Sequence, residues 1–283
     1  MLRRWLVKKA ILLFLILICI LACFPVVILL IGSLTGEQEL TASLKGVLYD
    51  KGISGVVLFP SLPTLRGYVN LLLDTPEFYV VFLNSVKITV CITAGQLLVA
   101  VPAAWGFSRW NSRVSSILFY LYTLLMLLPF QVTMLSNYIV LDKVGILDTH
   151  AAVILPAVFS TYSVFIIYRF FAGMPEDIFE AFSLESNSRI QKFLYIGIPM
   201  AVPGIKAAAL LSVVEYWNMI EQPLVFLKNP SLWPFSIYLP ELKSSNVQYI
   251  FVFSFMVLIP MILVIILGKD NLEKGIGTMI IKE

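Results

Sequence analysis

The sequence has little of what catalytic chemistry needs. Of its 283 residues, one is histidine, His150, and three are cysteine. A Ser-His-Asp triad or a histidine-based metal site within this chain is therefore poorly supported. There is no GxxxxGK[ST] phosphate-binding loop, and the one Gly-Lys pair, Gly268 and Lys269, lacks the glycine five positions earlier. We therefore expect no catalytic residues in this chain and no ATP hydrolysis by it.

The three cysteines, Cys19, Cys23 and Cys91, all fall within apolar runs. Cys19 and Cys23 are spaced to share one face of a helix. A buried cysteine usually behaves as a small apolar residue, so we expect neither a metal site nor a redox site there.

Charged residues are also scarce, at 13% of the chain, while 59% of the residues are hydrophobic. The mean hydropathy is +0.92. This composition predicts an integral membrane protein rather than a soluble globule. The formal net charge of +3 carries little information by itself, and no nucleic-acid partner is expected.

Six apolar runs predict an all-α membrane protein with six transmembrane helices in a single domain. The runs cover residues 10–31, 78–105, 117–136, 151–171, 207–227 and 249–267. The first is longer than the apolar core of a signal peptide and lacks a small-residue cleavage site, so it is interpreted as a span. The third is broken near its middle by Pro129.

The positions of the positive charges predict the orientation, because lysine and arginine concentrate in cytoplasmic loops. With both termini inside, thirteen of the twenty lysines and arginines lie in cytoplasmic segments and six lie outside, while Lys87 lies in a span. This arrangement puts the 33–77 loop outside, and the 174–203 loop and the 268–283 tail inside.

The 174–203 loop has helix-forming character of its own. Pro175 suits the first position of a helix, and Glu176 and Asp177 follow where the helix dipole favours carboxylates. Apolar residues from Ile178 to Phe182 then give this helix an apolar side. A bend is expected near Asn187, which can adopt the left-handed conformation. We expect two short helices with a bend between them; an interfacial amphipathic helix between two spans is the alternative.

This loop resembles the EAA loop of the permease subunits of bacterial ABC importers. The family pattern is a Glu-Ala-Ala triplet followed by a glycine and an Ile-x-Leu-Pro ending, and it maps onto Glu180, Ala181, Phe182, Ser186 and residues 196–199. Phe182 stands for the second alanine, Glu185 for an aspartate, Ser186 for the glycine and Ile198 for the leucine. The spacing and the final proline, Pro199, are kept.

In that family the loop is a coupling helix that docks into a groove on a separate ATPase subunit. The resemblance therefore implies ATPase-coupling roles for Glu180, Ala181, Phe182, Glu185, Ser186 and Pro199. The bend would then fall on Ser186 or Asn187, with some strain that a glycine would relieve.

Further stretches are similar to the carbohydrate branch of these permeases, the maltose-type and glycerol-phosphate-type systems. They are FPSLPTLRGYVNLL (59–72), FLNSVKIT (82–89), AAWGFSR (103–109), MLLPFQVTMLSNY (126–138), GILDTHAAVILP (145–156) and YWN (216–218). Their shared order and spacing strengthen the resemblance over most of residues 59–223.

The resemblance implies one permease subunit, in the bacterial inner membrane, of an ATP-driven importer for a sugar, oligosaccharide or polyol derivative. Its implied partners are a second, similar permease chain, two ATPase subunits and an extracytoplasmic binding protein. This chain would bind no cofactor, and ATP would bind to the partner subunits. The alternatives are a permease for a peptide or an amino acid and, from another class, an ion-coupled secondary transporter. The latter would need paired inverted repeats and interrupted helices, which the sequence does not show.

Polar residues within the predicted spans are candidates for the translocation path, because such groups in hydrocarbon normally face a bundle interior or a watery path. The candidates are Asn84, Lys87, Gln131, Glu215, Trp217, Asn218 and Glu221. Glu215, Asn218 and Gln222 are spaced to share a face of the fifth helix. Lys87 and Glu221 are predicted at similar depths and could pair. The alternative role for each is a hydrogen bond, or for Trp217 packing, between helices.

Overall fold

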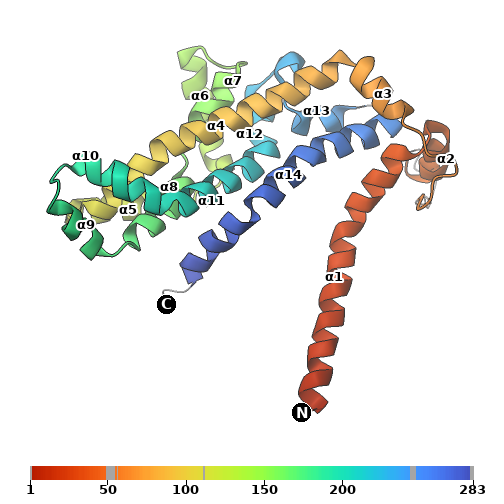
Figure 1. Ribbon diagram of the computed structural model, residues 1–283. Helices are drawn as coiled ribbons and strands as arrows, with labels where there is room; N and C mark the ends of the chain where they lie inside the picture. Colours follow the sequence, from red (N-terminus) through yellow and green to blue (C-terminus); the bar gives the residue numbers. More distant parts are fainter. Residues whose placement is uncertain (1, 49–54, 56, 111, 243–246, 281–283) are drawn as a thin grey trace. The chain divides into compact units, whose positions relative to one another are not determined.

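The computed structural model describes residues 2–48, 55, 57–110, 112–242 and 247–280, and every regular element in them is a helix (Figure 1). The helices are α1 (Leu2–Leu34), α2 (Glu37–Leu48), α3 (Arg66–Leu73), α4 (Pro76–Arg109), α5 (Arg113–Leu125), α6 (Phe130–Val144), α7 (His150–Val158), α8 (Thr161–Ala172), α9 (Glu176–Ser183), α10 (Arg189–Gln191), the π-helical turn η1 (Lys192–Gly197), α11 (Ile198–Trp217), α12 (Glu221–Phe226), the 3-10 turn η2 (Pro230–Leu232), α13 (Phe235–Glu241) and α14 (Val247–Ile280). Three of the cations that were counted to predict the orientation lie outside the described residues: Lys51, Lys243 and Lys282.

Five helical stretches are long and apolar enough to cross a membrane. They are Val7–Leu34, Pro76–Arg109, His150–Ala172, Arg189–Trp217 and Val247–Asp270. A sixth is added if the bent pair α5 and α6 forms one span. The predicted all-α membrane fold is therefore confirmed.

The bend between α5 and α6 corrects the predicted third span, residues 117–136. The two helices meet at 99°, and α6 runs on to Val144, beyond the end of the predicted span at residue 136. Pro129 explains the break: it has no N–H to donate, and it disfavours the helical conformation at the residue before it. At 13 and 15 residues, neither helix alone reaches the length of about 20 residues that a spanning helix needs.

The predicted fifth span, residues 207–227, is wrong at both ends. A continuous helical stretch begins at Arg189, inside the predicted loop, and ends at Trp217. Pro199 and Pro203 do not break it. The π-helical turn η1 lies just before Pro199, and such turns locally rearrange the backbone hydrogen bonds that a proline leaves incomplete. The second of the two expected short helices is therefore the start of a long one.

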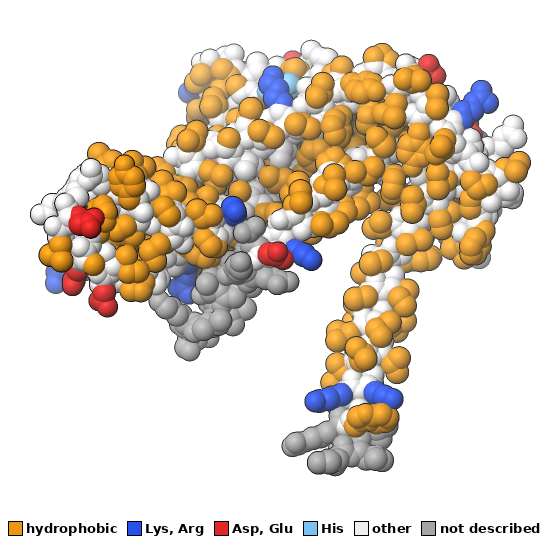
Figure 2. All heavy atoms as spheres, in the orientation of Figure 1, with side chains coloured by type: hydrophobic (Ala, Val, Ile, Leu, Met, Phe, Trp, Pro, Cys, Tyr) orange, Lys and Arg blue, Asp and Glu red, His pale blue; other side chains and the backbone are white. Residues whose placement is uncertain are grey.

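The chain divides into two compact units, and the first consists of Met1–Tyr79 and Leu239–Pro260. It contains two helices, α2 and α3, within the predicted 33–77 loop. The Ser33 and Tyr68 hydroxyls are 2.5 Å apart, and Gln248 Nε2 donates to the Thr35 carbonyl at 3.0 Å. Along most of its length α1 exposes apolar side chains (Figure 2).

The second unit consists of Val80–Tyr238 and Met261–Glu283 and holds two apolar clusters along α4. One joins Ala104 of α4 to Phe171 of α8, Phe179 of α9 and Ala201 of α11. The other joins Ile88 and Ile92 of α4 to α6, α7 and α12. The first cluster therefore fixes α9, the helix with the EAA-like sequence, against the end of α4.

Candidate functional site

The short helix α9 has one face packed and one face free. It begins at Glu176, directly after Pro175, with Glu176 and Asp177 in its first turn as expected. Phe179 is 7% exposed, whereas Glu180 and Ala181 are exposed. The packed face anchors the helix and leaves the motif residues available for contact.

Trp105, in the last turns of α4, lies at the centre of this anchor. Its ring centroid lies 5.2 Å from that of Phe171, 5.7 Å from that of Phe179 and 5.5 Å from that of Phe193. These rings come from α8, α9 and η1, so four elements meet at one tryptophan. Aromatic pairs in this range add stabilisation beyond the area that they bury.

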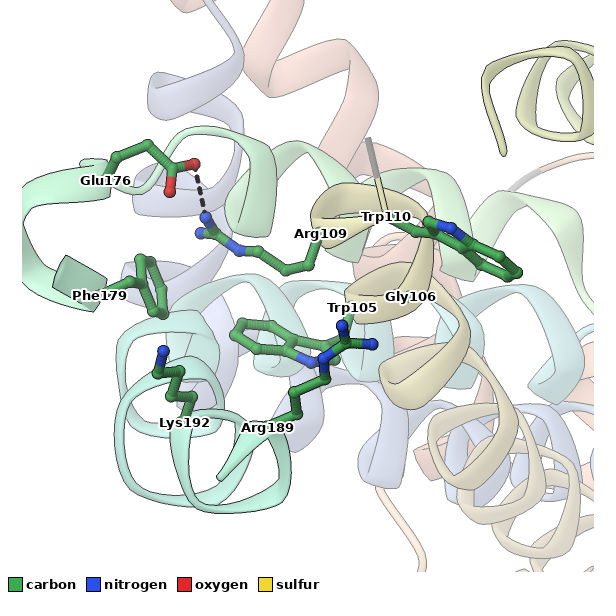
Figure 3. Close-up of a pocket in the computed structure, with 8 residues that line it drawn as sticks. All are labelled: Trp105, Gly106, Arg109, Trp110, Glu176, Phe179, Arg189 and Lys192. Atoms are coloured by element: carbon green, nitrogen blue, oxygen red, sulfur yellow. Dashed lines mark hydrogen bonds and ion pairs between the residues drawn. The ribbon is translucent and has the colours of Figure 1, made fainter. Parts of the chain in front are cut away.

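Arg109 adds polar interactions to the contact between α4 and α9 (Figure 3). Its guanidinium donates to Glu176 Oε1 at 2.7 Å and to the Phe171 carbonyl at 3.1 Å. It also lies 3.8 Å from the ring centroid of Phe179, within the range of a cation–π interaction. The arginine side chain is 18% exposed and Glu176 is 73% exposed, so one partner is shielded from water and the other is not. The end of α4 therefore holds the first two turns of α9.

The turn after α9 differs from the expected one. Among the described residues other than glycine, only Asp148 has a positive φ, so the left-handed conformation expected at Asn187 is wrong. Serine side chains stabilise this turn instead. Ser186 Oγ accepts from the Ser188 amide at 3.2 Å and contacts the Gln191 side chain, while Ser188 Oγ caps the Gln191 amide at 3.4 Å.

The remaining EAA-like residues lie in three settings. Glu185 is exposed in the turn, and Phe182 and Ser186 are half-buried. Pro199 is exposed near the start of α11, within the continuous helical stretch rather than at the end of a loop. The structure thus puts Glu180, Ala181 and Glu185 on an exposed surface and separates Pro199 from them by the turn and η1.

A cavity of about 470 Å³ lies beside α9 (Figure 3). Its lining residues come from the end of α4, from α9 and from the helical turns that follow, and they are Trp105, Gly106, Arg109, Trp110, Glu176, Phe179, Arg189 and Lys192. Three of them are cations and one is a carboxylate.

Two of the path candidates, Gln131 and Glu221, contact each other. Gln131 Nε2 of α6 donates to Glu221 Oε1 of α12 at 2.6 Å. Because α11 ends at Trp217, Glu221 lies in a separate helix, and the predicted shared face of Glu215, Asn218 and Gln222 is wrong. Lys87 is exposed, and no ion pair joins it to Glu221 in the part of the chain that the structure describes.

Asn84 and Trp217 are buried in protein contacts. Asn84 Nδ2 donates to the carbonyls of Ser231 and Trp233 at 2.9 and 3.1 Å. Trp217 is 6% exposed and packs on the rings of Phe82 and Phe235. Both contacts match the alternative role in helix packing. Glu215 and Asn218 are exposed, and Asn218 donates to the Val214 carbonyl at 3.2 Å.

Sequence reasoning missed the role of Arg109, which had been counted only among the positive charges that predict the cytoplasmic side. Its partners Phe171 and Glu176 lie more than 60 residues further along the chain, and no local pattern in the sequence indicates such a contact.

Comparison with known protein families identifies the family to which this chain belongs. Residues 96–277 match the family of binding-protein-dependent transport system inner membrane components. The chain belongs to this family. It is thus a multi-pass inner-membrane permease of an ABC importer, a transport subunit without catalysis of its own, and it works with an ATPase and a binding protein. The matched region includes α9 and the C-terminal part of α4, from residue 96 onward.

Individual relatives agree with this assignment. The arabinooligosaccharides transport system permease protein AraQ of Halalkalibacterium halodurans is 24% identical over 262 residues, which cover 92% of this chain and 91% of that protein. A probable ABC transporter permease protein of Pyrococcus horikoshii is 31% identical over 200 residues, 69% of this chain and 72% of that one.

The fold also matches a solved structure. A chain of a bacterial ABC transporter involved in the import of the acidic polysaccharide alginate superposes with a TM-score of 0.79. The match covers 95% of this permease and 96% of that chain at 18% identity, so it concerns the fold alone.

Proposed function

We propose that this permease imports a carbohydrate, as a sugar, an oligosaccharide or a related polyol derivative. The observation that supports this best is the similarity, along nearly the full length of both chains, to a permease of an arabinooligosaccharide transport system. The alginate importer that shares the fold also handles a carbohydrate. A permease for a peptide or an amino acid is the alternative within the same family.

We further propose that the exposed face of α9 and the turn after it form the coupling surface for the ATPase subunit. A coupling element must be rigidly joined to the membrane helices and must also present a free face to its partner. The packing of Phe179 and its contact with Arg109 join α9 rigidly to α4. The free face consists of the exposed residues Glu180, Ala181 and Glu185. Phe182, Ser186 and Pro199 would support that face by shaping the turn and the start of α11.

In this proposal the complex contains two ATPase subunits, which bind the ATP, and a second, similar permease chain. Closure of the ATPases would move α9, and α4 would follow because Arg109 and Trp105 hold the two helices together. The bundle would then alternate between two rigid packings. Our candidates for the translocation path are the exposed residues Lys87, Glu215 and Asn218 and the Gln131–Glu221 pair. Asn84 and Trp217 would instead stabilise the packing of the helices around the path.

The test of the coupling surface is uptake and ATP hydrolysis by the reconstituted complex carrying Glu180→Ala or Glu180→Lys. We expect uptake to fall about tenfold for Glu180→Ala, the effect of losing roughly 1.5 kcal/mol from one charge-assisted hydrogen bond. The charge reversal should also reduce co-purification of the ATPase. Asp142→Asn, which changes an exposed carboxylate of α6, is the control. Unchanged uptake and unchanged co-purification for both Glu180 variants would rule out this surface.

The test of the solute is direct binding of sugars, oligosaccharides, peptides and amino acids to the cognate binding protein by calorimetry. Micromolar binding of a carbohydrate is expected. Binding of a peptide or an amino acid alone would favour the alternative.

A further inference from the structure

The cavity beside α9 carries positive charge that its own residues do not balance. Its carboxylate, Glu176, is bound to Arg109 at 2.7 Å, and this is the one ion pair recorded among the described residues. Lys192 Nζ donates to the Ser183 hydroxyl at 2.6 Å, a neutral partner that does not balance a positive charge. Arg189 likewise has no carboxylate partner in the described part of the chain. Arg189 and Lys192 therefore leave the cavity two charges in excess.

The backbone adds to this excess. Both cations lie at the beginning of the helical stretch Arg189–Trp217, where the helix dipole is positive and favours anions over cations. A bound anion would therefore relieve two unfavourable terms, the repulsion between the cations and their repulsion by the helix end.

Trp110, an aromatic residue that lines the cavity, indicates which kind of molecule carries the anion. Trp110 follows the last residue of the span Pro76–Arg109 and is 70% exposed, a position typical of tryptophans at the headgroup level of a bilayer. Directly beyond it, α5 exposes Val114, Ile117 and Leu121. These exposed apolar side chains of the helix that follows Trp110 are the candidate surface for the acyl chains of a lipid whose headgroup enters the cavity.

We propose that this cavity binds the phosphate of an anionic membrane phospholipid, with Arg189 and Lys192 as the counter-charges. A volume of about 470 Å³ suffices for a glycerophosphate headgroup. The site is distinct from the proposed coupling surface, since neither Glu180 nor Glu185 lines the cavity. Free phosphate shares the recognised chemistry, and the experiment separates the two sources.

The experiment is native mass spectrometry of the purified, delipidated full-length chain, titrated with phosphatidylglycerol, phosphatidylcholine or inorganic phosphate at one ionic strength. Phosphatidylglycerol should be retained and phosphatidylcholine lost, because only the former has a net charge. Arg189→Gln and Lys192→Gln should each weaken phosphatidylglycerol binding about fivefold, as expected for one cation near an anionic lipid surface. The Arg189→Lys variant, which keeps the positive charge, should retain most of the affinity for phosphatidylglycerol.

The matched control is Lys269→Gln, which removes an exposed cation from α14. An equal loss for Lys269→Gln and Arg189→Gln would show that binding is general attraction to the membrane and would overturn the site. Inorganic phosphate that displaces the lipid at comparable concentration would overturn the lipid as the ligand. Unchanged lipid binding for both cavity variants, with loss of ATPase co-purification, would make the cavity a protein contact instead.

Discussion

Gln96 joins three membrane helices of the second unit through one side chain. It is 1% exposed, donates to the Ala157 carbonyl at 2.7 Å, and accepts from the hydroxyls of Ser163 at 2.9 Å and Ser212 at 2.7 Å. These partners lie in α7, α8 and α11. With no water in the bilayer core to replace such bonds, the amide acts as a joint between helices.

We therefore expect Gln96→Leu, which keeps the volume and removes all three bonds, to destabilise the chain by about 2 kcal/mol, at roughly 0.6 kcal/mol per bond. The measurement is the free energy of unfolding in mixed detergent micelles. The control is Thr93→Val, which removes a single longer contact of 3.4 Å to Ser212 and should cost much less. Equal losses for the two variants would contradict a joint at Gln96.

Asp148 joins two connecting segments and makes stability depend on pH. Its carboxylate accepts from the amides of Asn229 and Lys228, each at 2.8 Å. These two amide bonds, in that order, hold the pKa of Asp148 below its ordinary value. The folded chain thus binds fewer protons at this group than the unfolded chain. Its contribution to stability is complete above the unfolded pKa of about 3.9 and is lost as the pH falls through the lowered folded pKa.

Asp148→Asn should remove this contribution while keeping the backbone conformation, because asparagine tolerates the positive φ of 59° at this position. We expect the thermal midpoint of the variant to fall less between pH 5 and pH 3 than that of the parent chain. The measurement is a pH series of thermal unfolding in detergent. Asp142→Asn, at an exposed carboxylate of α6, is the control and should leave the pH dependence unchanged; an identical slope for Asp148→Asn would refute the expectation.

At the scale of the element, the turn from α9 to α10 reverses an expectation from sequence. A serine in the place of the family glycine suggested strain that glycine would relieve. The backbone there shows no positive φ, and Ser186 Oγ instead supports the amide of Ser188. Ser186→Gly should therefore loosen the turn.

We expect Ser186→Gly to speed amide hydrogen exchange in residues 184–192 about fivefold, the effect of losing a side-chain hydrogen bond of about 1 kcal/mol. Asn187→Gly is the matched control. It adds the same backbone freedom next to Ser186 but removes no side-chain hydrogen bond recorded by the structure. A larger increase for Asn187→Gly would show that backbone entropy, rather than the serine, stabilises the turn.

At the scale of the whole molecule, the orientation predicted from the positive charges stays a prediction, and cysteine labelling tests it. In a background lacking Cys19, Cys23 and Cys91, we expect Ser61→Cys to react with an impermeant maleimide from outside and Glu185→Cys only from inside. Both positions are exposed, so failure to react would reflect the side of the membrane rather than burial. Labelling of Ser61→Cys from the cytoplasmic side alone would invert the topology and move α9 away from any ATPase.

The sequence alone determined the class of the protein and the position of α9. Hydropathy is a local property of the chain, and hydrocarbon accepts a long apolar run only as a structure that satisfies its own hydrogen bonds. The presence of membrane helices could therefore be predicted without tertiary contacts, although the bounds of the third and fifth spans could not. Pro175, Glu176 and Asp177 likewise marked the start of α9, because the signals that begin a helix act within one turn.

Only the tertiary structure decided where helices break and what their polar residues do. Pro129 accompanies a 99° bend, whereas Pro199 lies in a continuous helical stretch, because a π-helical turn precedes it. Asn84 could be assigned to a brace only because its acceptors lie 147 and 149 residues further along. Arg109 changed from an orientation marker to the anchor of α9 for the same reason. The partner of a side chain depends on packing between distant segments, which local sequence patterns do not specify.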